Sequence, residues 1–471
     1  MTTLQHQTFN NPHPDLATGV VGAAIAQRFE ILYPGLSNEF LGLFSYVSPE
    51  ETLSIIGVGS EFQVETHKEG STLRMRLMHR DVVERESTYR LDGGDLHEEV
   101  FRHAASFIDE LRSFLSGHHR LPPSTVLLGG WRCGTHPENL EEPLIFTIPR
   151  ITCRVSAEEC QFSFFDSKEC PYPGGAIVDL PRDISPSSQL RVSRRRDIPE
   201  CREYIDNLVD LIGELSQEAL DKVVICREVR LFHQSELSPV ELLQMAASGK
   251  KTAHYEYVFR WSGGDAWVGV SPEMLVKKQR EKVVVEPLAG TRKGSNFKDK
   301  SERYRNELLS DGKEIEEHET AARMFYDNLS SVCIPESIEQ LESRGVLDLG
   351  YVQHLKSTIT GQLRPDINVF HLLAAIYPPA TIWGKPVLLS GARIRSHEQI
   401  ERGFFTGGFG FFTLGDDANF ALAIRTARMT GDEVRVYAGS GIVKRSDPYR
   451  EWLETSNKMQ PFLNNEFAVY L

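Results

Sequence analysis

The strongest constraint on the fold is a series of short apolar runs separated by tight turns. Runs such as TLSIIGVG, STLRMRLM, HYEYVFRW and DAWVGVS have the length and the β-branched and aromatic content of strands. The turns GDD and TGDE favour antiparallel pairing of the strands that they join. Amphipathic helices such as GDLHEEVFRHAASFIDELRSFLSG lie between groups of strands and do not alternate with single strands. The chain is therefore predicted to be α+β with mainly antiparallel strands.

Length and charge narrow the class of protein. The 471 residues are enough for two to four domains of average size or for one oversized domain. A net charge of -14 argues against a general affinity for nucleic acid or for anionic membranes. The N-terminus lacks the plan of a secretory signal, and no apolar run approaches the ~20 residues of a membrane span. Seven widely spaced cysteines without a CxxC pair indicate reduced, mostly buried thiols, so we expect a cytoplasmic protein.

Two predicted helices, the first of them over residues 301–331, each carry a pair of glutamates three residues apart. The pairs are Glu314 and Glu317 in KEIEEH, and Glu451 and Glu454 in REWLETSNK. This spacing puts both carboxylates of a pair on one helical face. One such pair alone is most simply a solvated face, but two helices with four carboxylates suit Mg²⁺. A di-iron site needs ExxH on a helix, whereas His318 directly follows Glu317, so we favour Mg²⁺ over iron.

Two further positions are candidates for acid–base chemistry. Lys222 opens the strand DKVVICREV, and Glu273 follows Ser-Pro in SPEML. Taken alone, the lysine is most simply exposed and the glutamate begins a turn. A lysine becomes a base only where burial or a neighbouring cation lowers its pKa from about 10.4 towards neutrality. The turn from Ala289 to Thr291 supplies a glycine at which backbone amides can approach an anion.

The segment of residues 173–200 is rich in Pro, Ser and Gly and contains an arginine run. Its composition predicts a crossing loop before a helix that begins near Ile198. The run, Arg194 to Arg196, is expected to be solvated, with phosphate binding as the alternative. Glycines of FFTGGFGFF lack the lysine and the strand-to-helix context of a phosphate-binding loop, so we expect them to allow close strand packing.

The order of the motifs resembles the chorismate-utilising enzymes, which include anthranilate, aminodeoxychorismate, isochorismate and salicylate synthases. The motifs are KVVICRE, SPEML, EPLAGTR, KEIEEH, GYVQHLKSTI, YPPATIWGKP and YAGSGIVKRSDPYREWLETSNK. The resemblance is dense from about residue 200 to 465. It implies one large body, residues 1–471, in which two large, mainly antiparallel sheets pack together with helices outside. Residues 1–197 would form its N-terminal portion and residues 198–471 its chorismate-binding catalytic portion.

The resemblance also implies roles for single residues. In the family, the position of Lys222 holds the base that activates water, and the position of Glu273 holds the acid that protonates the departing hydroxyl. His354 would lie beside the ring of the substrate. Mg²⁺ would be held directly by Glu317 and Glu454, and through its waters by Glu314 and Glu451. The substrate would further contact Gly290, Thr291, Thr381, Phe405, Arg425, Gly439, Gly441 and Lys458.

A few positions distinguish members of the family. Lys222 occupies the position at which ammonia-using members have glutamine. Ala289 occupies the position at which aminodeoxychorismate synthases have a nucleophilic lysine. The resemblance therefore implies that water is the nucleophile. Thr381 favours a salicylate synthase, which converts chorismate through isochorismate to salicylate and pyruvate. Ile382, Trp383 and Phe405 depart from the salicylate synthase pattern and keep open an isochorismate synthase that stops after hydration.

Two other readings stay open. An ammonia-using relative has the wrong residue at position 222, and a chorismate-sensing or metal-binding protein without turnover has no reason to keep the catalytic set. The preferred interpretation is a monomeric cytoplasmic enzyme whose substrate is chorismate. No glutamine amidotransferase partner, nucleic acid or membrane is expected.

Overall fold

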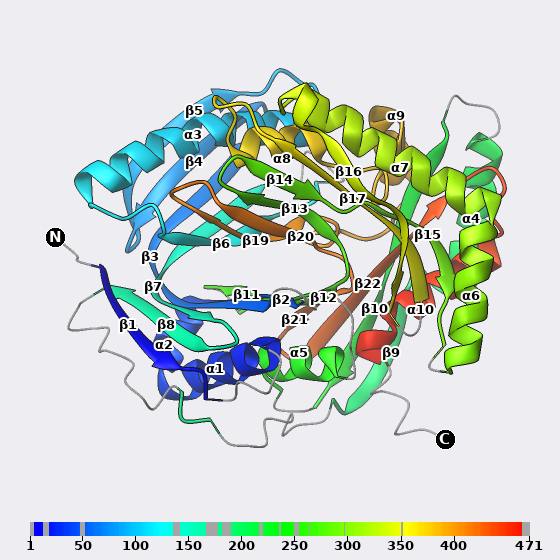
Figure 1. Cartoon of the computed structure of the whole chain (residues 1–471). Coiled ribbons are helices and arrows are strands. Elements are labelled where there is room, and N and C mark those ends of the chain that lie inside the picture. Colours follow the sequence, from blue (N-terminus) through cyan, green and yellow to red (C-terminus); the bar gives the residue numbers. More distant parts are fainter. Residues whose placement is uncertain are drawn as a thin grey trace.

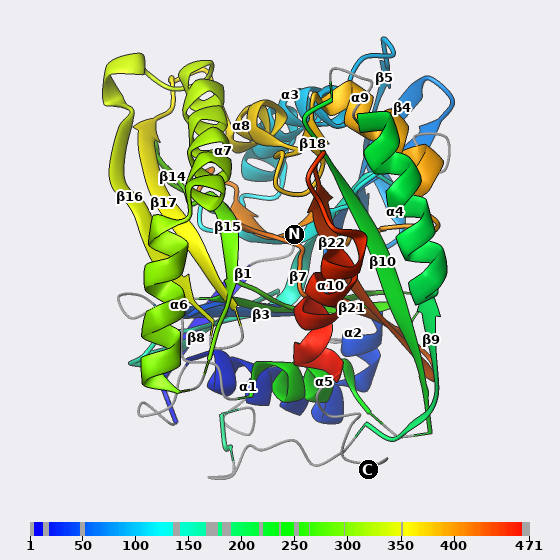
Figure 2. The same cartoon turned by 90° about the vertical axis from the view of Figure 1, so that its right-hand side faces the viewer.

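The computed structural model describes residues 4–12, 18–47, 52–134, 142–165, 178–180, 190–215, 220–234, 237–248, 254–262, 264–295, 297–349 and 352–463. Two broad layers of β-sheet face each other, and helices cover their outer sides (Figure 1). Seen from the side, the C-terminal helix and its neighbouring strands stand opposite a second group of strands and helices (Figure 2). The prediction of two large antiparallel sheets with helices outside is confirmed.

The helices are α1 (Thr18–Leu32), α2 (Pro34–Glu39), α3 (Leu96–His118), α4 (Cys201–Leu215), α5 (Pro239–Ala247), α6 (Lys298–Ser310), α7 (Gly312–Ser330), α8 (Val369–Ile376), α9 (Val387–His397) and α10 (Pro448–Leu463).

The strands are β1 (Leu4–Asn10), β2 (Phe40–Val47), β3 (Thr52–Glu69), β4 (Thr72–His79), β5 (Val82–Arg90), β6 (Val126–Trp131), β7 (Leu144–Val155), β8 (Glu159–Phe165), β9 (Val192–Ile198), β10 (Lys222–His233), β11 (His254–Trp261), β12 (Ala266–Ser271), β13 (Met274–Gln279), β14 (Lys282–Val285), β15 (Leu288–Lys293), β16 (Glu339–Asp348), β17 (Val352–Gln362), β18 (Gly384–Lys385), β19 (Gly408–Thr413), β20 (Ala418–Leu422), β21 (Thr426–Thr430) and β22 (Glu433–Ile442).

Antiparallel pairing links these strands into two layers that share β3 and β7. The layer that we call the lower sheet has the order β1-β8-β7-β3-β2-β11-β12-β21-β22-β10-β9. The upper sheet has the order β5-β4-β3-β7-β6-β19-β20-β13-β14-β17-β16, with β15 also on β17. The first part of β3 pairs with β2 and its last part with β4, and the β3–β7 register shifts between Ser60 and Phe62. An irregularity of this kind bends a strand, so β3 passes from one layer to the other.

Apolar side chains of the described residues form four clusters around the two sheets, of which the smallest lies between α4, α9 and β10. One core lies between the upper sheet and α3, α7 and α8, and another between the lower sheet and α1, α5 and α10. The third lies between the sheets and is rich in aromatic rings, such as Phe259 and Phe409, which stack with centroids 4.7 Å apart. The pattern of buried and exposed residues along the strands indicates that each sheet is covered on one or both faces, and the helices and the opposite sheet provide this cover.

Local sequence explains where the predicted elements begin and end. Helix α3 begins after Asp95, whose side chain accepts hydrogen bonds from the amides of His97 and Glu98 and so acts as the N-cap. The turns GDD and TGDE join β19 to β20 and β21 to β22, and both pairs are antiparallel as predicted. The stretch of residues 301–331, predicted as one helix, is divided at Asp311 into α6 and α7. Asp-Gly at this point interrupts the helical pattern.

The arginine run was predicted to be solvated and to lie in a loop; its side chains are exposed as expected, but the loop was wrong. Residues 192–198 form β9, an edge strand that pairs with β10, and α4 begins at Cys201. Arg194 covers the ring of Phe232 at 4.1 Å, and Arg195 pairs with Asp197 at 3.0 Å. Charged side chains are common on edge strands because they discourage pairing with a further strand. Most of the remainder of the predicted loop lies outside the described residues.

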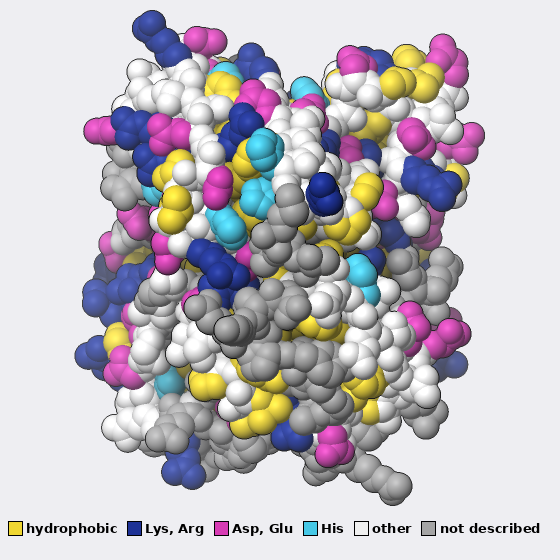
Figure 3. All heavy atoms as spheres, turned by 90° about the vertical axis from the view of Figure 1, so that its left-hand side faces the viewer, with side chains coloured by type: hydrophobic (Ala, Val, Ile, Leu, Met, Phe, Trp, Pro, Cys, Tyr) yellow, Lys and Arg dark blue, Asp and Glu magenta, His cyan; other side chains and the backbone are white. Residues whose placement is uncertain are grey.

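The surface and the cysteines agree with the composition. Basic and acidic side chains are interspersed on the face seen in Figure 3. Within the described ranges, no helix is long and apolar enough to cross a membrane. The six cysteines in these ranges are free thiols, and all but Cys201 are buried; Cys170 lies outside the described residues.

Candidate active site

One cavity gathers most of the residues predicted to form the site. Its walls come from β10, β22 and α10 on one side and from β15, β17 and α7 on the other, and Figure 2 shows these two groups opposite each other. The predicted residues that line it are Lys222, Glu273, Gly290, Thr291, Glu317, His354, Thr381, Phe405, Arg425, Gly439, Gly441, Glu454 and Lys458. Glu314 and Glu451 do not line it, but each is on the helix of a glutamate that does. One glutamate of each pair, Glu317 or Glu454, therefore faces the cavity.

Lys222 reaches the cavity across β22. It is the first residue of β10, which pairs with β22 so that Val224 lies opposite Gly441. A Cβ atom at residue 441 would lie only 2.3 Å from Lys222 Cε. Glycine at this position therefore leaves the path along which the lysine extends. The Lys222 ammonium then pairs with Glu317 on α7, with 2.6 Å between Nζ and Oε1.

Glu273 lies in the short connection between β12 and β13 and is only 5% exposed. Its backbone N–H donates to Ser271 Oγ at 3.3 Å, and Thr381 Oγ1 donates to its Oε1 at 3.5 Å. Burial raises the pKa of the Glu273 carboxyl to about 8, although the Thr381 hydrogen bond and the charge of Lys222 act in the opposite direction. At neutral pH this side chain therefore carries a proton that it can donate.

His354 and the β15 turn form another wall. The Nδ1 atom of His354 lies 3.1 Å from Thr291 Oγ1. Burial, with the charges of Arg425 and Lys458, lowers the pKa of His354 to about 3, so the ring is neutral. Gly290 has φ +75°, and a Cβ there would also lie 2.8 Å from the carbonyl oxygen of Glu314. The Glu314 carboxylate accepts a hydrogen bond from the Thr291 N–H at 2.8 Å, so it fixes this turn against α7.

The second glutamate pair lies beside Lys458 on α10. Lys458 Nζ is 2.7 Å from Glu454 Oε1 and donates to the Gly439 carbonyl at 2.8 Å. Burial favours a raised pKa at Glu454, but the adjacent Lys458 outweighs it and lowers the pKa. Burial and the charge of Glu454 raise the pKa of Glu451 to about 7. Glu451 and Glu454 therefore bring two acidic groups close together, and a nearby cation offsets their negative charge.

The four glutamates were tested as a set of metal ligands. Within the described part of the chain, no three His, Cys, Asp or Glu side chains lie close enough together to share a metal ion. Glu317 and Glu454 nevertheless face one cavity, and each contacts a lysine ammonium there. Carboxylate oxygens that already attract cations fit a hard ion such as Mg²⁺. The residues present therefore suit the predicted ion.

Arg425 reaches the cavity from a strained backbone. It lies between β20 and β21, has φ +51°, and is buried. Its carbonyl oxygen accepts a hydrogen bond from the Val270 N–H at 3.1 Å. A non-glycine residue in the left-handed region costs free energy and persists where the surrounding structure holds it, often at functional sites.

Sequence reasoning missed a buried ion pair behind the cavity. Arg402 Nε lies 2.8 Å from Glu398 Oε1, and its two other nitrogens donate to the carbonyls of Ile382 and Val224 at 3.0 and 2.8 Å. Glu398 also accepts from the Cys226 N–H at 2.9 Å. The ion pair between Arg402 and Glu398 therefore connects Ile382, next to Thr381, to strand β10. Glu398 and Arg402 lie in the non-helical connection after α9, so no helical spacing signalled this pair.

The positions that distinguish family members lie on different sides of the cavity wall. Ile382 and Phe405 line the cavity, and the Phe405 ring stacks on Tyr437 with centroids 5.3 Å apart. Trp383 is buried outside it, where its Nε1 donates to the Val387 carbonyl at 2.9 Å. Its bulk is therefore accommodated elsewhere and does not fill the candidate site. Tyr437, a cavity residue, had no sequence signal of its own.

The comparisons with known proteins agree with this arrangement. Residues 65–464 match the family described as chorismate binding enzyme. The chain belongs to this family. It is a chorismate-utilising enzyme, as the motif order implied.

Relatives of two activities are similar to the chain. It is 25% identical to the isochorismate synthase MenF of Bacillus subtilis over 429 residues, which cover 89% of this chain and 87% of the relative. It is 29% identical to anthranilate synthase component 1 of Methanothermobacter thermautotrophicus over 314 residues, 65% of this chain and 64% of the relative. The isochorismate synthase DhbC of Bacillus subtilis is 31% identical over 277 residues, 57% of this chain and 68% of the relative.

Solved structures share the fold. The isochorismate synthase DhbC of Bacillus anthracis superposes with a TM-score of 0.70 at 20% identity and covers 94% of this chain and 99% of its own. MenF of Escherichia coli, a menaquinone-specific isochorismate synthase, gives a TM-score of 0.69 at 20% identity and covers 98% of this chain and 95% of its own. At such identities the likeness extends to the fold alone.

Proposed function

We propose that the protein converts chorismate to isochorismate by adding water to the ring and expelling the ring hydroxyl. The observation that carries this proposal is the pairing of Lys222 and Glu273 on one cavity, with Glu273 buried and its pKa raised to about 8. Two of the similar relatives are isochorismate synthases, which supports the same reaction.

The two side chains supply the proton transfers. Lys222 accepts a proton from water as its oxygen bonds to the ring carbon beside the carboxylate. Glu273 donates its proton to the departing hydroxyl, which leaves as water. One water enters and one leaves, and a proton passes from Lys222 back to Glu273 to restore the starting state. The ion pair of Lys222 with Glu317 has to open, and the ammonium has to lose a proton, before the neutral amine can act as the base.

Mg²⁺ would be held by Glu317 and Glu454, supported by Glu314 and Glu451. When bound, it would neutralise the ring carboxylate of chorismate and favour charge development during displacement. Glu314 is already fixed by the Thr291 amide, so it is placed to support Glu317 one turn along α7. Opening of the two lysine contacts would free both carboxylates for the ion.

Positive and neutral groups in the cavity suit the other parts of the substrate. We assign the enolpyruvyl carboxylate to Arg425, whose guanidinium matches a planar carboxylate. Lys458 would hold the ring carboxylate, and Gly290 lets the backbone approach it closely. The neutral ring of His354 would contact the substrate ring without adding charge.

A second candidate is the further conversion of bound isochorismate to salicylate and pyruvate. The observation that favours it is Thr381, which occupies the position typical of salicylate synthases and donates to Glu273. The step rearranges one molecule into two and needs positioning and exclusion of water, with no additional catalytic side chain. Thr381→Ala should then lower the ratio of salicylate to isochorismate, whereas an unchanged ratio removes the threonine from this step.

Product analysis tests both candidates. Purified protein is incubated with chorismate and Mg²⁺, and isochorismate, salicylate and pyruvate are measured over time. Isochorismate without pyruvate supports hydration alone, and equal amounts of salicylate and pyruvate support the second step. Glu273→Gln should abolish both, while Glu336→Gln, an exposed glutamate outside the cavity, should have no effect. A product that requires ammonium, or a folded protein that leaves chorismate unchanged, would overturn the proposal.

A further inference from the structure

A buried arginine lies behind the wall that β10 contributes to the active-site cavity. Arg227 is near the middle of this strand, and its side chain has no exposed surface. Lys222, Val224 and Cys226 of the same strand line the cavity. Because successive side chains of a strand point to opposite faces, Arg227 lies on the other face of β10. The proposed chemistry makes no use of this buried cation.

The guanidinium of Arg227 joins β10 to α10, which stand side by side in Figure 2. Its Nε atom donates to Thr455 Oγ1 at 2.8 Å, and its Nη2 atom donates to Ser456 Oγ at 2.7 Å. Its Cζ atom lies 3.6 Å from the centroid of the Trp452 ring, so the cation also stacks on an aromatic face. The remaining nitrogen, Nη1, pairs with Asp197 of β9 at 3.0 Å. The guanidinium is therefore bonded along its edges and packed on its face.

The two hydroxyl groups extend these contacts to the backbone of α10. Thr455 Oγ1 and Ser456 Oγ each accept a hydrogen bond from Arg227, and each donates to the Trp452 carbonyl at 2.9 Å. Hydrogen bonds that are linked in a chain polarise and strengthen one another. Arg227 therefore fixes the helical turn from Trp452 to Ser456.

This turn carries the part of α10 that faces the active site. Glu454 directly precedes Thr455, and Lys458 follows one turn later on the same helical face. Among the described residues of α10, the buried apolar side chains lie further along the helix, at Met459, Phe462 and Leu463. Apolar packing thus anchors the end of the helix, and the Arg227 contacts anchor the turn that holds Glu454.

We propose that Arg227 is a positioning residue that holds the first turns of α10, and with them Glu454 and Lys458, in place at the active site. Its effect on the reaction rests on the proposed roles of Glu454 in Mg²⁺ binding and of Lys458 in substrate binding, whereas the anchoring of α10 does not. Lysine is not equivalent here, because an ammonium has no planar face to stack on Trp452 and no fixed fork of donors.

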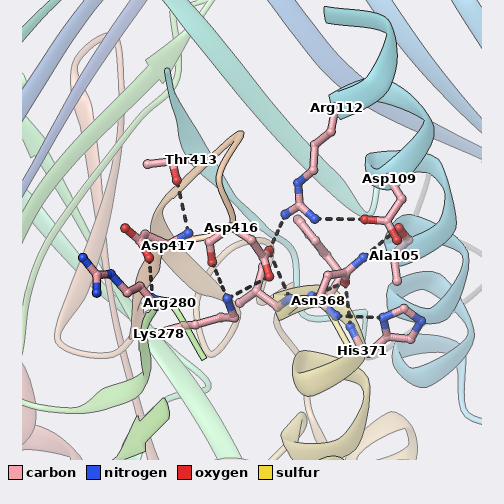
Figure 4. Close-up of polar contacts among 12 residues, drawn as sticks. Ala105, Asp109, Arg112, Lys278, Arg280, Asn368, His371, Thr413, Asp416 and Asp417 are labelled. Carbon is pink, nitrogen blue, oxygen red and sulfur yellow. Dashed lines mark hydrogen bonds and ion pairs between the residues drawn. The ribbon is translucent and has the colours of Figure 1, made fainter. Parts of the chain in front are cut away.

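Arg112 provides a matched control for the loss of a buried cation. It joins α3 to the turn between β19 and β20 through ion pairs with Asp109 and Asp416 (Figure 4). None of these three residues lines the active-site cavity. Arg112→Met therefore removes ion pairs from a mostly buried arginine, as Arg227→Met does, but leaves α10 untouched.

Hydrogen exchange of the protein without chorismate or Mg²⁺ tests the anchoring. Arg227→Met and Arg227→Lys should speed amide exchange in residues 452–458 at least about tenfold, because hydrogen bonds to a charged donor no longer oppose local opening. Thr455→Val removes one acceptor with little change of shape and should act in the same direction, whereas Thr455→Ser should not. Arg112→Met should leave exchange in residues 452–458 unchanged. Thr455→Val tests the same contact if Arg227→Met does not fold.

Calorimetry with Mg²⁺ alone, followed by steady-state kinetics, tests the effect on the active site. Arg227→Met should weaken Mg²⁺ binding at least about tenfold and lower kcat/KM for chorismate, and high Mg²⁺ should restore part of the turnover. Thr455→Val should shift both quantities in the same direction, and Thr455→Ser should recover most of the loss. Arg112→Met should keep the Mg²⁺ affinity and kcat/KM of the unaltered protein, although it also lowers the free energy of unfolding.

The outcomes separate anchoring, stability and the proposed reaction. Exchange in residues 452–458 that is the same in Arg227→Met and the unaltered protein overturns the proposal. Faster exchange with unchanged Mg²⁺ affinity and kcat/KM, or equal losses in Arg227→Met and Arg112→Met, overturns the role at the active site. An unaltered protein that neither binds Mg²⁺ nor converts chorismate overturns the proposed function, and the exchange measurement alone then decides whether Arg227 holds α10.

Discussion

Replacing Glu273 by Gln should abolish turnover and at the same time stabilise the protein above neutral pH. The carboxyl is buried, and burial raises its pKa from 4.5 to about 8. The folded state thus holds this proton more tightly than the unfolded state. Stability from this group is complete below pH 4.5, declines as the pH rises, and is lost above about pH 8. Glutamine has nearly the same shape and never ionises, so the variant lacks the decline.

The magnitude follows from the shift. One pKa unit corresponds to about 1.4 kcal/mol. Because the carboxyl ionises more readily in the unfolded state, the free energy of unfolding falls by roughly 3 kcal/mol at pH 7 and by about 5 kcal/mol above pH 8, relative to low pH. Compared with the unaltered protein, Glu273→Gln should therefore gain free energy of unfolding between pH 5 and pH 8. Its Oε1 can still accept the Thr381 hydrogen bond, so the difference at pH 5 should be small.

Urea unfolding at pH 5, 7 and 8 measures this difference. Glu336→Gln serves as the matched control, since the same chemical change is made at an exposed position. The reasoning is refuted if the free energy of unfolding of Glu273→Gln parallels that of the unaltered protein across this range. The same side chain would then be solvated or ionised in the folded state, and its role as the acid would fail with it.

Four further predictions follow from the site. The turnover of chorismate should fall as pH rises through about 8, because Glu273 then loses the proton that it donates; a rate that stays constant to pH 9.5 contradicts this. Gly441→Ala should lower kcat at least about tenfold, because its Cβ would displace Lys222, whereas Gly117→Ala, with open space around it, should leave kcat unchanged. Arg402→Met should cost about 3 to 5 kcal/mol in urea unfolding, since it leaves Glu398 buried without its partner; a loss below about 1 kcal/mol would mean that the pair is not buried. Removal of Mg²⁺ with EDTA should stop turnover and its return should restore it, while activity that persists in EDTA would remove the ion from the reaction.

Local sequence determined much of the fold. Short apolar runs, tight turns and the helical spacing of apolar residues predicted the strands, their antiparallel pairing and α3, because these depend on contacts within a few residues. The arginine run was misread because its charges suggest a loop, whereas an edge strand tolerates them on its exposed side. The break at Asp311 was missed because the helical periodicity continues on both sides of it.

For the site, the sequence supplied residue types and order, and tertiary structure supplied the contacts. The ExxE spacing alone placed Glu314 and Glu317 on one face, and the motif order assigned them roles. Only the packing of α7 against β15 and β10 shows that one accepts a backbone N–H while the other meets Lys222. Burial, which keeps Glu273 protonated, also arises only when distant strands close over it.

The sequence by itself thus determined the chemistry that is available: two glutamate pairs, a lysine, a further glutamate and the glycines that let backbone approach a ligand. It did so because side-chain chemistry and local propensity are properties of short segments. The tertiary structure decided that Lys222 and Glu273 share a cavity and that Trp383 lies outside it. Those facts depend on strands far apart in the chain, and their register is fixed only when both sheets pack.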